Sequence, residues 1–219
     1  MEVSIKIKGN KYVLPEEVNA RQWSMISILP NDQKHLISTV LGCSPLDLAV
    51  IEDYEVEEVY QYCTIALKGL QSQDEPQVSF ETLEEITFGQ WVDLDVLAHR
   101  DANLYMCEIL ELLGFENAEE MPLSKALPTF KEYLSWRTQV YRRYRNLFGL
   151  DEASVESPED NPVDIERIWY DAIMLLSDNN FSNMDMVTEK PYKAALNFMA
   201  WKKEQTQKEI EQLKKIQKK

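Results

Sequence analysis

The stretch EEITFGQWVDLDVLAHRD, from Glu84 to Asp101, decides the fold class because it carries both a helix start and a helical apolar pattern. Thr87 and Gln90 stand in the S/T-x-x-E/Q relation of a capping box, which predicts a helix beginning at Phe88. The apolar residues that follow at helical spacing are Phe88, Trp91, Leu94 and Leu97. The stretch is therefore predicted to be an amphipathic helix with one side in the core.

The charged residues of this stretch raise the question of catalysis. His99-Arg100-Asp101 matches the tripeptide that opens the catalytic loop of protein kinases, but Met106 stands where that motif has asparagine, and the glycine-rich loop, V-A-I-K and D-F-G are missing from the sequence. Asp93 and Asp95 are expected near the helix N-terminus, where the helix dipole favours negative charge. We interpret these charges as structural, with His99-Arg100-Asp101 at or just past the last turn.

The N-terminal stretch VSIKIKGNKYVLP, from Val3 to Pro15, has a different period. Its apolar and polar residues alternate, Gly9-Asn10 supplies a turn, and Pro15 stops the pattern. This pattern predicts a β-hairpin. A further short strand is expected at 78–80.

Helical spacing and end signals fill most of the remaining chain. Helices are expected over 18–29, over 35–41 ending at Gly42, after the Ser44-Pro45 cap, over 57–70, over 104–113 ending at Gly114, from Pro122 to Gly149, from Pro162, and from about Pro191 to the C-terminus. The predicted fold is mainly α, with an N-terminal β-hairpin followed by a multi-helix bundle and a projecting C-terminal helix.

Composition shifts suggest four successive segments. These are an N-terminal hairpin with short helices (1–75), a central helical region (76–150), an acidic linker (151–162), and a C-terminal helical region with a charged tail (163–219). The linker is proposed because it is rich in acids and contains prolines.

Length and composition predict a globular protein. The chain has 219 residues, of which 44% are hydrophobic, enough to fill a core. The N-terminus lacks the apolar segment of a signal peptide, and no apolar run reaches the roughly 18 residues of a membrane span. We expect a soluble, intracellular protein with no membrane partner.

Metal and cofactor chemistry finds little support in the residue spacing. The histidines His35 and His99 and the cysteines Cys43, Cys63 and Cys107 form no zinc-ligand pattern, and the unpaired cysteines suit a reducing compartment. We predict no catalytic, metal or cofactor-binding residue and no cofactor.

One enzymatic alternative is kept. Glu108 and Glu111 lie at i, i+3 spacing and could hold a hard metal or act as acid and base, although no Glu-x-x-His motif accompanies them. A metal-dependent enzyme that uses carboxylates is therefore the less favoured hypothesis.

Charge is distributed unevenly along the chain. The net charge is −15, which disfavours nucleic acid as a partner, yet residues 202–219 carry a local +4, so the rest of the chain carries −19. A second basic segment, 131–145, interleaves arginines with aromatic residues. Both basic segments suit docking onto an acidic partner or another copy of the chain. The alternative is that they are solvated helix faces, with the aromatic rings of 131–145 packed in the core. The candidate partner-binding residues are Arg137, Tyr141, Arg142, Arg145, Trp201, Lys202 and Lys203.

Three segments resemble proteins encoded among the structural genes of tailed bacteriophages. They are IKIKGNKYVLPEEVNARQW near the N-terminus, FETLEEITFGQWVDLDVL in the centre and KPYKAALNFMAWKKEQTQKE near the C-terminus. They resemble tail assembly chaperones and related head-tail morphogenesis proteins, in which a hairpin of the form I-x-I-x-G-x-x-Y-x-x-P precedes helices and a tail rich in lysine and glutamate follows.

The resemblance implies a non-enzymatic assembly protein. Its implied partners are phage structural proteins, namely the tape-measure protein and tail or portal-proximal proteins, or a second copy of itself. Its implied location is the host cytoplasm during assembly, or the virion. A structural component of the neck, ring or tail is the alternative that the resemblance leaves open.

Overall fold

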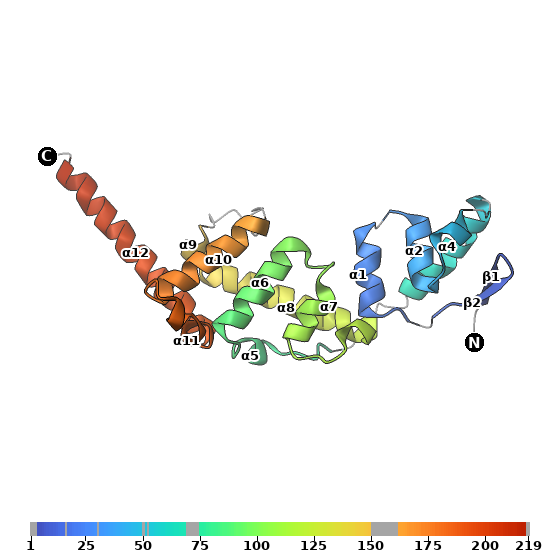
Figure 1. Cartoon of the computed structure of the whole chain (residues 1–219), viewed down its shortest axis with the longest axis horizontal. Coiled ribbons are helices and arrows are strands. Elements are labelled where there is room, and N and C mark those ends of the chain that lie inside the picture. Colours follow the sequence, from blue (N-terminus) through green and yellow to red (C-terminus); the bar gives the residue numbers. More distant parts are fainter. Residues whose placement is uncertain are drawn as a thin grey trace. The chain divides into compact units, whose positions relative to one another are not determined.

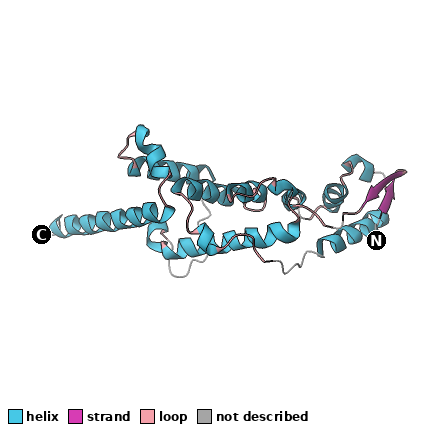
Figure 2. Ribbon diagram, turned by 90° about the horizontal axis from the view of Figure 1, so that it is seen from below, coloured by secondary structure: helices cyan, strands magenta, loops and turns pink. Residues whose placement is uncertain are grey.

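The structure, a computed structural model, describes residues 4–15, 17–29, 31–49, 51, 53–68, 75–149 and 162–217. Over these residues the chain is mainly α-helical, with an N-terminal hairpin followed by helices and a long C-terminal helix (Figures 1 and 2), as predicted. It divides into two compact units, each described here by itself. Unit 1 comprises 1–77 and 101–131, and unit 2 comprises 78–100 and 132–219, so the units interleave along the chain rather than following one another.

The predicted hairpin is present in unit 1, with its turn one residue earlier than expected. Strand β1 (Ser4–Ile7) pairs antiparallel with β2 (Asn10–Val13), and Ile7 lies opposite Asn10. The loop is Lys8-Gly9, whose φ angles are +50° and +81°. Positive φ at both loop positions is the requirement of a type I′ turn, whose twist matches that of the two strands, so Lys8 adopts it beside the glycine.

Several helices of unit 1 begin at a residue whose side chain caps them. The helices of this unit are α1 (Ala20–Ile28), α2 (Gln33–Leu41), α3 (Pro45–Leu48), α4 (Asp53–Lys68), α7 (Met106–Leu112), the short 3₁₀ helix η1 (Ala118–Glu120), and the first part of α8 (Leu123–Arg143). Asn19 and Gln22 form a capping box at α1, and Gly42 ends α2 in the left-handed conformation.

Backbone and side-chain contacts connect the parts of unit 1. Leu123 N–H donates to the Val18 carbonyl at 2.9 Å. The Tyr12 hydroxyl donates to Asp47 at 3.3 Å, and this contact fixes the hairpin against α3. The three cysteines are free and buried. Burial raises the pKa of Cys63 to about 12, so this thiol stays protonated at neutral pH.

Among the described residues of unit 2, all the regular elements are helices. They are α5 (Phe80–Leu83), α6 (Phe88–Asp101), the rest of α8, α9 (Arg145–Phe148), α10 (Pro162–Leu176), the short 3₁₀ helix η2 (Phe181–Asn183), α11 (Met184–Thr188) and α12 (Tyr192–Gln217). The predicted strand at 78–80 is wrong, because the Ser79 side chain caps α5 and Phe80 is its first residue. The expected helix from Pro122 to Gly149 is interrupted at Tyr144, between α8 and α9. The predicted acidic linker lies outside the described residues, except for Pro162.

The core of unit 2 is built around Trp91 of α6. The capping box at the start of α6 is confirmed, since Thr87 N–H donates to the Gln90 side chain at 3.0 Å and Gln90 N–H donates to Thr87 Oγ1 at 3.2 Å. The Trp91 ring packs edge-on against Trp136, at 5.4 Å between centroids, and stacks on Tyr192 at 5.6 Å. These aromatic contacts join α6, α8 and α12.

Candidate functional site

The residues predicted to contact a partner lie in different environments. Arg137 and Tyr141 are buried within unit 2, whereas Arg142 and Arg145 are exposed. Trp201 is 55% exposed on α12. Because buried side chains do not form a docking surface, Arg137 and Tyr141 do not belong to one.

Arg137 and Tyr141 instead bind a carboxylate in the interior. Asp95 of α6 is 0% exposed, and Arg137 Nε donates to its Oδ1 at 2.7 Å. The Tyr141 hydroxyl and Trp169 Nε1 each donate to its Oδ2 at 2.9 Å. Donors from α8 and α10 therefore converge on one side chain of α6, and this satisfied network holds the three helices together.

His99 lies one turn beyond Asp95 and completes this network. Its Nδ1 is 2.7 Å from Arg137 Nη2. The same nitrogen lies 3.0 Å from the Asp95 backbone carbonyl oxygen, so the imidazole sits between the Arg137 guanidinium and the α6 backbone. His99 therefore supports the Arg137 side chain, and the tripeptide His99-Arg100-Asp101 forms the last turn of α6, as the sequence predicted.

The Asp95 carboxyl and the Arg137 guanidinium are held in their ionised forms. Burial by itself raises the pKa of Asp95, but the adjacent Arg137 guanidinium and the hydrogen bonds hold that pKa below its usual value. Burial and the Asp95 charge together raise the pKa of Tyr141. The carboxylate accepts from three side chains and is closed to solvent, so its position suits a structural role rather than proton transfer.

The expectation that Asp93 and Asp95 lie at the helix N-terminus was wrong, because the first turn of α6 contains no acidic residue. For Asp95 the sequence contained a signal of its burial. Asp93 is exposed, whereas Asp95 is buried. Asp95 follows Trp91 by four positions and Phe88 by seven, so it occupies the same helix face as the apolar residues.

A second carboxylate, Glu84, lies at the edge of unit 2. Arg143 Nη1 and Trp136 Nε1 each lie 3.1 Å from it, and Lys193 also forms an ion pair with it. Burial opposes the ionised form, but these three donors outweigh it and lower the pKa of Glu84 to about 2. Glu84 therefore links the end of α5 to α8 and α12.

The second half of α12 presents an uncovered face. From Thr206 to Ile216 every side chain is exposed, including the apolar residues Ile210 (46%), Leu213 (59%) and Ile216 (70%). Lys203 marks the boundary, because its Nζ donates to the Leu147 carbonyl at the end of α9 at 2.8 Å. The first half of α12 thus packs in unit 2, whereas every side chain from Thr206 to Ile216 is exposed.

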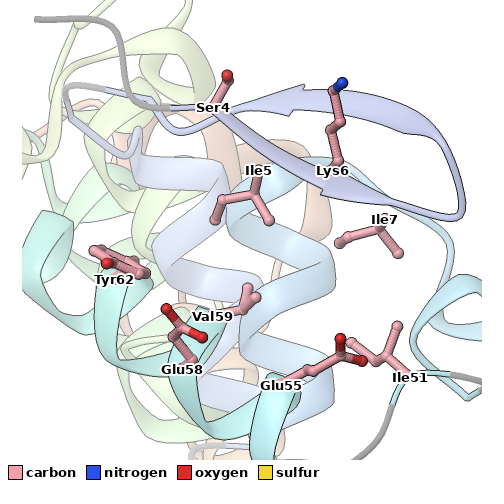
Figure 3. A pocket seen from close by; sticks show the side chains of 9 residues that line it. All are labelled: Ser4, Ile5, Lys6, Ile7, Ile51, Glu55, Glu58, Val59 and Tyr62. Atoms are coloured by element: carbon pink, nitrogen blue, oxygen red, sulfur yellow. The ribbon is translucent and has the colours of Figure 1, made fainter.

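Two depressions accompany these features. One of about 280 Å³ lies beside α12 and is largely apolar. Its lining residues are Leu176, Met186, Val187, Lys190, Ala194, Ala195 and Phe198. The other, of about 370 Å³, is a groove in unit 1 between β1 and α4 (Figure 3).

Neither a metal centre nor a membrane span is found in the part of the chain that the structure describes. Glu108 and Glu111 are exposed on α7, and no group of three or more histidine, cysteine, aspartate or glutamate side chains among the described residues could hold a metal ion. No described helix is both long and apolar enough to cross a bilayer.

Comparisons of this chain with protein-family models, with curated proteins and with solved structures found no match.

Proposed function

We propose that this chain is a non-enzymatic morphogenesis protein of tailed bacteriophages, a tail assembly chaperone that binds a phage structural protein through the second half of α12. The observation that carries the proposal is the exposed apolar stripe of Ile210, Leu213 and Ile216. The resemblance of the hairpin, the α6 region and the α12 region to such proteins supplies the biological setting.

The stripe has the geometry of a helix-binding surface. Residues three apart on an α-helix differ by about 60° in direction, so the three side chains lie within roughly 120° of one another, on one face. An isolated helix of this length is marginally stable in water, and apolar contact with a partner would stabilise it. The stripe is therefore suited to packing against an apolar stripe on another helix.

The charges around the stripe indicate the chemistry of the partner. Lys208, Lys214 and Lys215 lie among the exposed residues of this segment, whose 202–219 region carries +4. A helix with acidic residues beside its apolar face would complement it. For a tail assembly chaperone, the resemblance implies the long helical tape-measure protein as that partner.

The test is recovery of partners from phage-producing cells with tagged protein, followed by mass spectrometry. The wild type should recover a phage tail protein, and Ile210→Ser with Leu213→Ser and Ile216→Ser should lose it. Gln207→Ser with Gln212→Ser changes exposed polar residues of the same segment and should keep the partner. Equal recovery by the triple serine variant and the wild type would reject the α12 surface.

Two further measurements separate the alternatives. Detection of the protein in purified phage particles at fixed stoichiometry would favour a structural neck, ring or tail component over a chaperone. Stoichiometric metal in the purified protein, with thermal stabilisation by Mg²⁺ or Mn²⁺, would favour a metal-dependent enzyme and contradict the proposal.

A further inference from the structure

The outer edge of β1 has backbone groups that the hairpin does not use. With a two-residue loop, the flanking residues Ile7 and Asn10 exchange hydrogen bonds, and in an antiparallel ladder every second pair then does the same. Ile5 therefore also bonds to β2, whereas the N–H and C=O groups of Ser4 and Lys6 point away from β2. Within the described residues the sheet has only these two strands, so this edge of β1 has no strand beside it.

This edge opens onto the groove beside α4. Four consecutive residues of β1, Ser4 to Ile7, line the groove, and no residue of β2 does. A groove under the face of the sheet alone would be lined by alternate residues of both strands, so the lining pattern places it at the edge of β1. Figure 3 shows Ile5 and Ile7 pointing toward the α4 side and Lys6 pointing away.

The opposite wall combines apolar surface with carboxylates. Tyr62 is 44% exposed and lies beside Val59, and Ile51 lies at the end of the groove. Glu55 and Glu58 are exposed on α4 and line the same groove (Figure 3). The Lys6 side chain points to the other face of the strand. The described side chains that face the groove from both walls are therefore apolar, phenolic or acidic, with no cation among them.

We propose that the outer edge of β1 binds an extended segment of a partner protein as a third strand, with a lysine or arginine of that segment facing Glu58. Main-chain groups of Ser4 and Lys6 supply the strand pairing, and the groove selects the side chains. This site lies in unit 1 and extends the proposed function by a second, independent binding element.

The charges favour a different protein over a second copy of this chain. If β1 of another copy paired with this edge, its groove-facing side chains would be isoleucines, and Glu58 would gain no positive partner. A foreign strand with a basic residue at a groove-facing position provides one.

The test uses the full chain and a fluorescent nine-residue peptide of alternating lysine and valine, measured by fluorescence anisotropy. Lys6→Pro removes an outward-facing N–H while leaving the hairpin bonds intact, because proline is accepted where the N–H faces solvent on an edge. Its matched control is Lys11→Pro, which removes the outward N–H of the residue paired with Lys6 on β2. We expect at least about tenfold weaker binding for Lys6→Pro and wild-type affinity for Lys11→Pro.

The charge requirement is tested separately. Glu58→Lys should weaken binding of the lysine peptide about tenfold and strengthen binding of the same peptide with glutamate in place of lysine. The triple serine variant of α12 should bind the lysine peptide like the wild type, so failure at one surface is distinguishable from failure at the other.

Several outcomes would overturn the proposal. Equal peptide affinity for Lys6→Pro and the wild type would exclude strand pairing, and so would peptide binding that leaves hydrogen exchange of the Lys6 amide unchanged in the wild type. Because the exchange measurement uses the wild type, it tests strand pairing even if Lys6→Pro folds poorly. Concentration-dependent dimerisation of the wild type that Lys6→Pro abolishes would identify a second copy as the occupant and reject the basic partner strand.

Discussion

At the scale of single residues, unit 2 is organised by two carboxylates that differ in their access to water. Asp95 is enclosed and receives hydrogen bonds from three helical side chains, whereas Glu84 lies near the surface with two cations beside it. Removing one member of a buried ion pair leaves the other charge without compensation, so the two sites should respond differently to the same chemical change.

The first prediction concerns Asp95. Asp95→Asn should destabilise the protein by about 3–5 kcal/mol, because the buried Arg137 guanidinium loses its counter-charge. Urea unfolding followed by circular dichroism measures this loss. The control is Asp93→Asn on the exposed side of the same helix, which should change stability by less than about 0.5 kcal/mol. Equal effects of the two variants would refute the structural role of Asp95.

The second prediction concerns pH and Glu84. The pKa of Glu84 is lowered to about 2 in the folded protein, from 4.5 in the unfolded chain, so its ionised form stabilises the fold above about pH 4.5. This stabilisation is lost as the pH falls from about 4.5 to about 2. At pH 7 the loss in Glu84→Gln should be on the order of 1–2 kcal/mol after allowance for solvent screening.

The measurement is urea unfolding of the wild type and Glu84→Gln between pH 7 and pH 2.5. The difference between the two proteins should shrink steadily below pH 4.5. A difference that stays constant down to pH 2.5 would show that the Glu84 charge does not stabilise the fold.

At the scale of helices and strands, several ends follow from local chemistry that the sequence displays. The capping box of Thr87 and Gln90 and the glycine that ends α2 were predictable, because each acts within one turn of the chain. The hairpin turn was misplaced by one residue, and Ser79 caps a helix where a strand was expected. Short elements near a turn are decided by which register packs best, which a local pattern does not contain.

The third prediction tests one of these ends. Gly42 has φ +66°, and no described atom lies within 4 Å of the place that a Cβ would occupy, so Gly42→Ala should cost about 1 kcal/mol through backbone strain alone. Thermal unfolding measures the effect. Gly42→Asn should cost less, since asparagine tolerates the left-handed region better. An alanine variant as stable as the wild type would contradict the strain argument.

At the scale of the whole molecule, stability and the proposed partner binding reside in different parts of the chain. The core of unit 2 uses Tyr192 and Leu196 from the start of α12, while the second half of the same helix buries nothing among the described residues. One helix therefore serves both the fold and the proposed contact surface.

The fourth prediction follows from that division. Truncation after Gln205 should change the unfolding temperature by less than about 2 °C, because the removed side chains that the structure describes are exposed, and it should abolish recovery of the partner. Truncation after Lys190 removes Tyr192 and Leu196 and should unfold unit 2. Calorimetry compares the two truncated proteins. A large loss of stability on truncation after Gln205 would show that the tail belongs to the fold.

The sequence by itself determined the mainly α fold, the N-terminal hairpin and several helix ends, because periodicity and caps are short-range properties. The spacing of Asp95 from Phe88 and Trp91 places it on the apolar face of the helix, but only the tertiary structure decided which groups bind it there. Asp93 and Asp95 are the same residue type two positions apart on one helix, yet one is exposed and the other binds Arg137, Tyr141 and Trp169. Those donors come from positions 42 to 74 residues away, and a distant partner is set by helix packing rather than by the local pattern.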